Sequence, residues 1–193
     1  MLFRSLAGAR IDEIAAATRT SKRMIYYYFG DKDGLYRRVL EDAYREMREG
    51  EEKLELGHLL PVAALRSLVG FTFDHHSRNP DFIRLVMIEN IHRGAYLLQS
   101  DDIRELNKGA ISKLREIYRR GLASGDFRAG LDPVELHWQI SALCFFNESN
   151  RATFSALFGK APWTAAGQAT LRRHVVGMVL RFVLEPRLID RNA

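Results

Sequence analysis

The chain has 193 residues and a formal net charge of +5, with 47% hydrophobic and 27% charged residues. This balance excludes an intrinsically disordered chain, and no apolar run reaches the roughly 18–20 residues that cross a bilayer. The single cysteine, Cys144, excludes an internal disulfide framework, and residues 1–10 lack the apolar stretch of a signal peptide. We therefore expect a cytoplasmic globular protein with no membrane partner, built as one core or as a small domain fused to a larger one.

The first part of the chain has the apolar periodicity of helices. Residues 11–18 and 22–29 are each spaced for one face of a short helix. Asp31 can cap a longer third helix, whose apolar stripe covers residues 35–47. Between residues 19 and 38 the sequence has six basic and two acidic side chains. Such a run is usually a solvated helix face, and it is also compatible with a polyanionic partner.

The middle of the chain continues the helical pattern. An apolar stripe covers residues 62–76, and Asn79 stands as the N-cap of the next helix, before a proline. That helix, over residues 81–91, is apolar on nearly every side, which predicts burial. Gly94 ends it.

The last part of the chain adds three long helical segments. Asp101 or Asp102 can cap a helix that ends at Gly125, and a further helix begins at an Asp-Pro pair and is expected over residues 133–157. Thr164 can cap the last helix. Since no segment alternates convincingly like a strand, the sequence predicts an all-α fold of about nine helices.

The sharpest signal is a pair of short helices joined by a tight turn over residues 11–29. Ser21 can cap the second helix, directly after the turn at residues 19–20. Such a helix-turn-helix unit lays its second helix in the major groove of DNA. Ile25 and Phe29 are four residues apart and face inward, which leaves the basic and tyrosine side chains pointing outward.

At these residues the sequence resembles the TetR family of transcriptional regulators. The resemblance rests on Ile14 and Ala15, on residues 21–29 with the sequence SKRMIYYYF, and on Lys32 and Leu35. Each part alone is a weak signal, but the combination is specific. Beyond this motif the chain is similar to the family in the number, length and spacing of its helices.

The resemblance implies a helix-turn-helix DNA-binding domain over residues 1–47 and a helical effector-binding and dimerisation domain over residues 48–193. It implies a DNA-binding transcriptional regulator, a repressor that a small-molecule effector releases from its operator. The partners would be a palindromic double-stranded DNA operator, an effector of unknown identity and a second copy of the chain. No cofactor is implied.

By position, the resemblance also assigns a set of DNA-contacting side chains. Arginine can donate two hydrogen bonds to guanine, and lysine and tyrosine can reach phosphate oxygens. Lys32 would anchor a phosphate, and Tyr28 stands where the family often has a histidine near the DNA backbone. Tyr26 could instead pack in part, and Tyr27 could be exposed without a role. The full set is Thr20, Ser21, Lys22, Arg23, Tyr26, Tyr27, Tyr28 and Lys32.

Two departures from the family pattern affect these expectations. The family usually has a glycine in the turn, where this chain has Arg19, so we expect a differently shaped turn or an added phosphate contact. The family has a full first helix before the motif, and residues 1–6 supply at most a fragment of one. We therefore expect a shortened N-terminus. The alternative function is a dimerising, ligand-binding partner that does not bind DNA itself.

The candidate effector pocket and dimer interface lie in the second domain. For the pocket we expect a mostly apolar lining and a small aromatic, heterocyclic or lipid-like effector, although simple core packing is the default for such residues. The pocket candidates are Phe73, Phe82, Met87, Asn90, Tyr96, Tyr118, Trp138 and Phe145. The family dimerises through its last two long helices, and here the stripe Leu171, Val175, Met178, Val179 and Phe182 would serve, shared with the chain's own core.

Other candidate chemistry is weaker. Adjacent residues on a helix point about 100° apart, so His75 and His76 make a poor metal chelate and are expected as a surface or loop-facing pair. Cys144 is expected as a small core side chain. We place no catalytic set and no metal site, and an all-helical enzyme is the least favoured reading.

Overall fold

The computed structural model describes residues 10–186, and the fold in this range is all-α, as predicted. No strand occurs in residues 10–186; a single isolated bridge joins Phe127 and Leu184. The described part of the chain has nine α-helices: α1 (Ile11–Ala17), α2 (Lys22–Phe29), α3 (Lys32–Glu52), α4 (Pro61–Arg78), α5 (Pro80–Ile91), α6 (Asp101–Ser124), α7 (Pro133–Ser149), α8 (Arg151–Phe158) and α9 (Ala165–Val183). Three short 3-10 helices, η2 (Leu56–His58), η3 (Leu97–Gln99) and η4 (Ala161–Trp163), lie in the connections.

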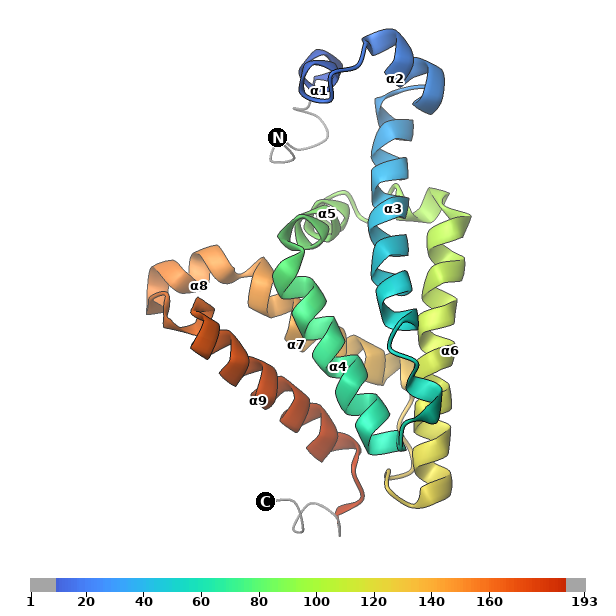
Figure 1. Ribbon diagram of the computed structural model, residues 1–193, viewed down its shortest axis with the longest axis vertical. Helices are drawn as coiled ribbons and strands as arrows, with labels where there is room; N and C mark the ends of the chain where they lie inside the picture. Colours follow the sequence, from blue (N-terminus) through green and yellow to red (C-terminus); the bar gives the residue numbers. More distant parts are fainter. Residues whose placement is uncertain (1–9, 187–193) are drawn as a thin grey trace.

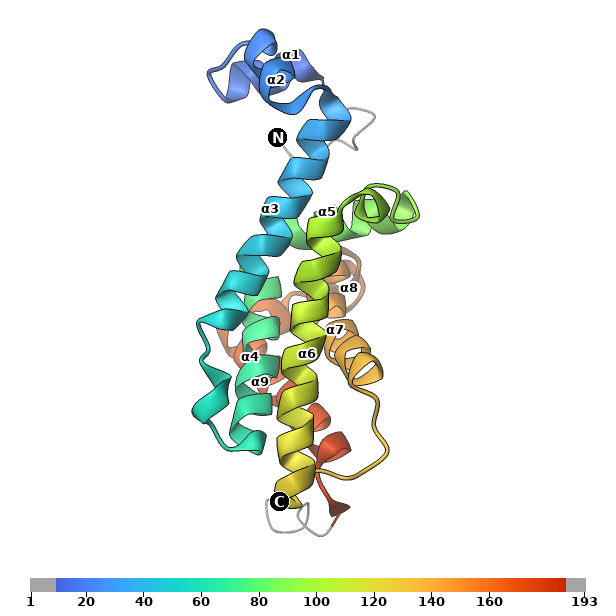
Figure 2. The same cartoon turned by 90° about the vertical axis from the view of Figure 1, so that its right-hand side faces the viewer.

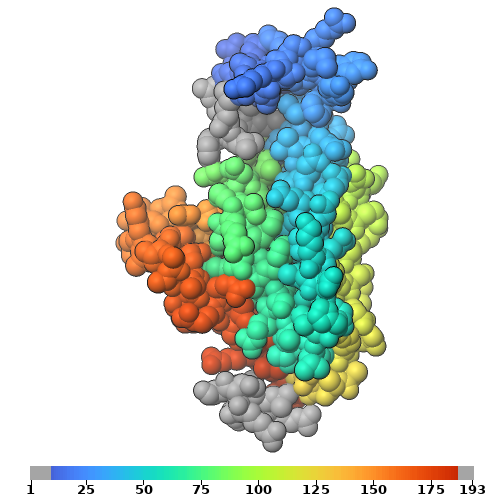
Figure 3. Space-filling model, viewed as in Figure 1, coloured from blue at the N-terminus to red at the C-terminus, as the bar shows by residue number. Residues whose placement is uncertain are grey.

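The molecule is elongated, with α1 and α2 at one end (Figure 1). They sit on the N-terminal end of α3, which runs into the body and lies beside α6 in both cartoon views (Figures 1 and 2). In the space-filling view α1 and α2 project beyond the body, and α8 protrudes from its side (Figure 3). This arrangement leaves the outer surface of α2 free to meet a partner.

The main core forms around α4, which packs against α6, α7 and α9. Its apolar stripe repeats with helical spacing, so Leu65, Val69 and Phe73 all point into this core. Tyr118 of α6 packs there too, and its hydroxyl donates to the carbonyl of Arg128 at 2.8 Å. The body is therefore one packed unit on which α3 lies as an outer helix.

Most predicted helix starts have the expected caps. Ser21, Asp31 and Thr164 each accept a hydrogen bond from a backbone N–H in the first turn of the following helix. The predicted cap of α6 is wrong: Ser100, and not Asp101 or Asp102, accepts from the N–H of the third helical residue. The two aspartates occupy the first turn instead, where a negative charge also stabilises the helix dipole.

Two predictions for individual helices are corrected. The segment expected as one helix over residues 133–157 breaks at Asn150, whose backbone is non-helical. Just before the break, the carbonyl of Asn147 accepts from the indole N–H of Trp163 at 3.1 Å. The structure also overturns the full burial of α5. One flank packs on α3, α4 and α7, while Met87 and Ile91 on the other are exposed.

Candidate nucleic-acid interface and ligand cavity

The turn between α1 and α2 keeps the left-handed geometry that a glycine would favour. Arg19 has φ 53°, so the expectation of a differently shaped turn is wrong. Ser21 follows in an extended conformation, and its hydroxyl accepts from Met24 N–H at 3.2 Å. Ile25 is 3% exposed between its neighbouring helices, and Phe29 is half-buried. The helix-turn-helix therefore has the geometry that its sequence predicts. Residues 1–6, on which the shortened first helix depends, lie outside the described residues.

The outward face of α2 is basic and aromatic. Thr20, Arg23 and Tyr26 are exposed, as are Tyr27 and Tyr28, whose rings meet edge to face at 5.1 Å. These groups can therefore reach a partner without any rearrangement of the core.

The side chain of Lys22 is shared with α1. Its ammonium group lies against the carboxylate of Asp12, and both side chains are about half exposed. Because an exposed ion pair of this kind contributes only about 0–1 kcal/mol, a phosphate can compete for Lys22. Arg23 forms no ion pair among the described residues, so it is the cation of α2 most available to a nucleic acid.

Lys32 begins α3 directly after a tight junction with α2. Gly30 has φ 76°, and Asp31 accepts from the N–H of Gly34 at 2.7 Å. A Cβ atom on Gly34 would clash with the carbonyl oxygen of Phe29, so this glycine allows the two helices to meet closely. The junction places the half-exposed Lys32 three residues after the end of α2.

A cavity of ≈ 300 Å³ lies between α3, α5, α6 and α7, and His76 of α4 also lines it. Four of the eight predicted pocket residues line it: Phe82, Asn90, Trp138 and Phe145. The other lining side chains look in the sequence like ordinary core or surface positions of their helices, so they were not predicted. They are Tyr44, Met47, Arg48, His76, Val86, Asn107, His137, Ser141 and Ala142.

The other four predicted pocket residues lie elsewhere. Phe73 and Tyr118 are in the main core, because α4 and α6 turn those positions toward α9 and the 126–131 loop. Met87 lines a separate groove beside α8. Tyr96 packs edge to face on Tyr36 of α3, with ring centroids 4.9 Å apart.

The histidine pair is buried, so its prediction as a surface pair is wrong. His75 and His76 contact the ring of Phe82, and neither Nδ1 has a hydrogen-bond partner among the described residues. Burial, followed by the field of His75, lowers the pKa of His76 to about 3. Burial also lowers the pKa values of His75 and His137. All three imidazoles are therefore neutral at pH 7.

Cys144 is a buried core residue, as predicted, and burial raises the pKa of its thiol to about 12. The described residues hold no group of three or more side chains positioned for a metal ion. None of the helices in residues 10–186 is long and apolar enough to cross a membrane.

The middle of α3 is fixed to the body by a buried carboxylate. Glu89, 1% exposed, accepts from the N–H groups of Tyr96 and Leu97 at 3.2 Å each. Tyr96 in turn packs on Tyr36, and Ser100 donates to the Glu41 carboxylate at 2.8 Å. The segment after α5 therefore holds α3 midway between α2 and the cavity.

The predicted dimer stripe of α9 splits between two environments. Val175 and Val179 are buried in the chain's own core, and Leu171 is half-buried against it. Met178 and Phe182 are 49% and 39% exposed. Further apolar side chains are exposed on α7 and α8, namely Phe146, Leu157 and Phe158.

The fold and these sites define a helix-turn-helix protein with a ligand-sized cavity in its helical body, and comparisons with known proteins agree. Residues 4–39 match the family described as "Bacterial regulatory proteins, tetR family", and residues 61–179 match "Tetracyclin repressor-like, C-terminal domain". The second match alone covers more than half of the chain. The chain belongs to the TetR family and is a transcriptional regulator of that class.

Individual relatives support the same assignment. The chain is 39% identical over 149 residues to the HTH-type transcriptional repressor NicS of Pseudomonas putida, covering 77% of this chain and 70% of NicS. The crystal structure of the regulator SCO4942 from Streptomyces coelicolor is 26% identical, with a TM-score of 0.68 over 96% of this chain and 92% of that one. AibR, crystallised with isovaleryl coenzyme A and operator DNA, shares the fold at 19% identity and a TM-score of 0.67, over 92% and 90% of the two chains.

Proposed function

We propose that the protein is a repressor that binds a palindromic operator as a homodimer and leaves it when a small molecule fills the cavity beside α3. The observation that carries this proposal is the continuity of α3. One helix holds α2 at its N-terminal end and lines the cavity with Tyr44, Met47 and Arg48. A ligand in the cavity therefore contacts the same helix that positions the DNA-reading surface.

Because α3 is long, a shift at its cavity end moves α2 at its other end. An α-helix rises 1.5 Å per residue, so Tyr44 lies about 18 Å along the axis from Lys32. A ligand that binds best when α3 holds the two α2 helices at the wrong separation would lower operator affinity. Coupling of this type is typically about 1–3 kcal/mol, or roughly 5–150-fold in affinity.

A dimer follows from the proposed operator, because a two-fold symmetric site requires two reading helices about one DNA turn apart. The exposed apolar side chains of α8 and α9 supply a self-complementary face for it. Phe158 is 68% exposed and Phe182 39% exposed, although both are large apolar residues. The same proposal takes residues 1–47 as the DNA-binding domain and residues 48–193 as the effector-binding and dimerisation domain, and it places the protein in the cytoplasm.

The relatives are consistent with this proposal. NicS is named a repressor, and the AibR structure holds an effector and an operator together on this fold. The cavity of ≈ 300 Å³ is at the lower limit of the roughly 300–1,000 Å³ range of small-molecule sites. This volume favours an effector smaller than the isovaleryl coenzyme A in the AibR structure.

The test of DNA binding is in vitro selection from random double-stranded DNA, followed by fluorescence anisotropy on the recovered sequence. A palindromic site bound by the wild type is expected, and Arg23→Ala should weaken binding by about 1–3 kcal/mol and relax base preference. Failure to bind any duplex would favour the alternative of a partner protein without DNA binding of its own. Turnover of a bound metabolite would point to an enzyme.

A further inference from the structure

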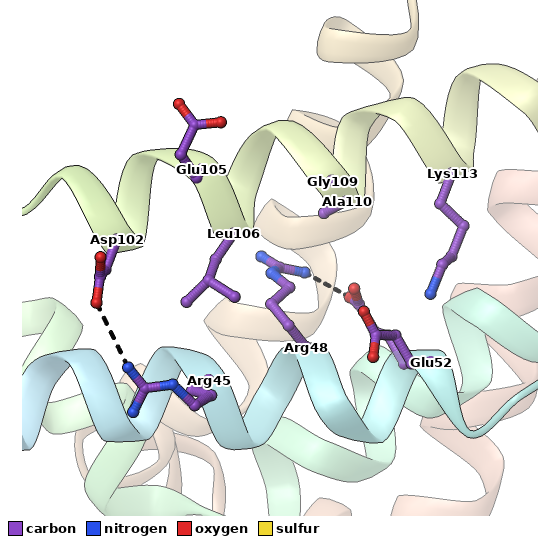
Figure 4. Close-up of a pocket in the computed structure, with 10 residues that line it drawn as sticks. Arg45, Arg48, Glu52, Asp102, Glu105, Leu106, Gly109, Ala110 and Lys113 are labelled. Carbon is purple, nitrogen blue, oxygen red and sulfur yellow. Dashed lines mark hydrogen bonds and ion pairs between the residues drawn. The ribbon is translucent and has the colours of Figure 1, made fainter.

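The cavity contains one formally charged side chain among its described lining residues, Arg48. Its guanidinium donates from Nη1 to Glu51 Oε1 at 2.6 Å and from Nη2 to Asn107 Oδ1 at 2.8 Å. The side chains of Arg48 and Glu51 are both buried, with exposed fractions of 8% and 4%. Figure 4 shows Arg48 between α3 and α6. Arg48 lines both the cavity and a separate, charged groove, whose other lining residues include Glu51, Glu52, Asp102 and Lys113. The carboxylate of Glu51, which lines the charged groove, therefore already neutralises the positive charge of Arg48.

The remaining polar groups of the cavity add no charge. Burial keeps His76 and His137 neutral at pH 7, as described above. Asn90 donates to the carbonyl of Val86 at 2.9 Å, which leaves its side-chain oxygen as an acceptor. The hydroxyls of Tyr44 and Ser141 make no hydrogen bond among the described residues, so they can donate to a ligand or accept from one.

The walls of the cavity are aromatic. Phe82, Phe145 and Trp138 line it together with Tyr44, and Trp138 is 70% exposed, at the open side. A cavity of about 150 Å³ holds a benzene ring. A volume of ≈ 300 Å³ is therefore suited to a substituted single ring or a fused pair.

We infer that the cavity binds an uncharged aromatic molecule of one or two rings, and that Glu51 sets this preference by neutralising Arg48. The inference deepens the proposed function, since it names the ligand class of the same cavity. An anionic ligand beside Arg48 would bring a second negative charge close to the buried Glu51 carboxylate, and only one positive charge is present to offset the two. A cationic ligand would find no free carboxylate in the lining, and a buried unpaired charge is costly.

Three planar probes of matched size test the inference on the full chain. Benzamide is neutral, benzoate is an anion and benzamidine is a cation at pH 7. Titration followed by NMR or calorimetry should give a benzamide dissociation constant at least about tenfold lower than that of either charged probe. Benzoate or benzamidine binding as tightly as benzamide overturns the inference, and so does the absence of binding by all three at millimolar concentration.

The role of Glu51 is tested by Glu51→Gln, which keeps the shape and an acceptor for Arg48 but removes the compensating charge. The benzoate-to-benzamide affinity ratio should rise by about tenfold or more. Glu52→Gln is the matched control, because the neighbouring Glu52 is exposed and lines only the outer groove. It removes the same formal charge and should leave the ratio unchanged. An unchanged ratio in folded Glu51→Gln, or an equal rise in both variants, contradicts the inference.

A second variant keeps the test decisive if Glu51→Gln does not fold. Asn107→Asp preserves an acceptor for Arg48 and adds a negative charge at the cavity, so the benzamidine-to-benzamide ratio should rise. No change in that ratio would overturn the charge argument. These measurements concern binding selectivity alone. The proposed repressor function fails separately, if a bound ligand leaves operator affinity unchanged.

Discussion

Replacing Lys32 with alanine should separate DNA binding from folding. Lys32 is the first residue of α3, where its positive charge opposes the helix dipole. Removing a cation from this position stabilises a helix by about 0.3–1 kcal/mol at low salt, so the melting temperature should not fall. If Lys32 contacts a phosphate, the same change weakens DNA binding, and the two effects have opposite signs.

The salt dependence gives the size of the effect. A dimer has two copies of Lys32, and each phosphate contact contributes about −0.9 to the slope of log K against log salt. Lys32→Ala should therefore make the slope less steep by about 1.8. Between 50 and 200 mM salt, the wild type should then lose about tenfold more affinity than the variant does.

The control for this experiment is Lys53→Ala, at the other end of the same helix. Lys53 is exposed and caps the C-terminal end of α3, about 32 Å from the reading surface along the helix. Lys53→Ala changes the net charge by the same amount as Lys32→Ala. Fluorescence anisotropy at four salt concentrations would measure all three slopes. Equal slopes for the two variants would refute a specific phosphate contact by Lys32.

Three further outcomes are expected. Phe158→Asp should convert the dimer to a monomer in sedimentation equilibrium without loss of helix content, whereas Ile91→Asp, equally exposed but on α5, should leave the dimer intact. Burial lowers the pKa of His76 to about 3. Below the ordinary histidine pKa of about 6.5, protonation of His76 therefore favours the unfolded state. This histidine should make the chain about 2 kcal/mol less stable at pH 5 than at pH 7. Urea denaturation at both pH values measures the total stability difference, and His76→Gln should reduce it by about 2 kcal/mol. Part of the difference should remain, because burial also lowers the pKa values of His75 and His137. Gly121→Ala places a Cβ atom against the buried ring of Phe127. It should lower the free energy of unfolding by about 1–3 kcal/mol and the melting temperature by about 2–12 °C. An unchanged melting temperature would contradict the close packing of Gly121 on Phe127.

Local signals explain why most of the fold could be predicted from the sequence. Ser21, Asp31 and Thr164 are side chains that cap the helix following them, whatever the tertiary structure, and the structure has them there. At the start of α6 three consecutive residues can all cap. Only the extended backbone at Ser100 selects among them.

The cavity was harder to predict because it depends on how the helices pack. Phe73 and Phe82 are equally apolar in sequence, yet one lies in the core and the other lines the cavity. Arg48 and Glu51 read as part of the charged face of an exposed helix. Their burial arises because α6 lies across them, and no pattern within α3 indicates this.

If the cavity and the operator are coupled through α3, a ligand and operator DNA must each weaken the binding of the other, and a linkage measurement detects this. Compounds that raise the melting temperature of the wild type identify a ligand, and anisotropy on the selected operator then gives DNA affinity with and without it. We predict that saturating ligand weakens operator binding by roughly 5–150-fold, and that operator DNA weakens ligand binding by the same factor. A ligand that binds in the cavity, as shown by loss of binding in Trp138→Ala, but leaves operator affinity unchanged would contradict this coupling.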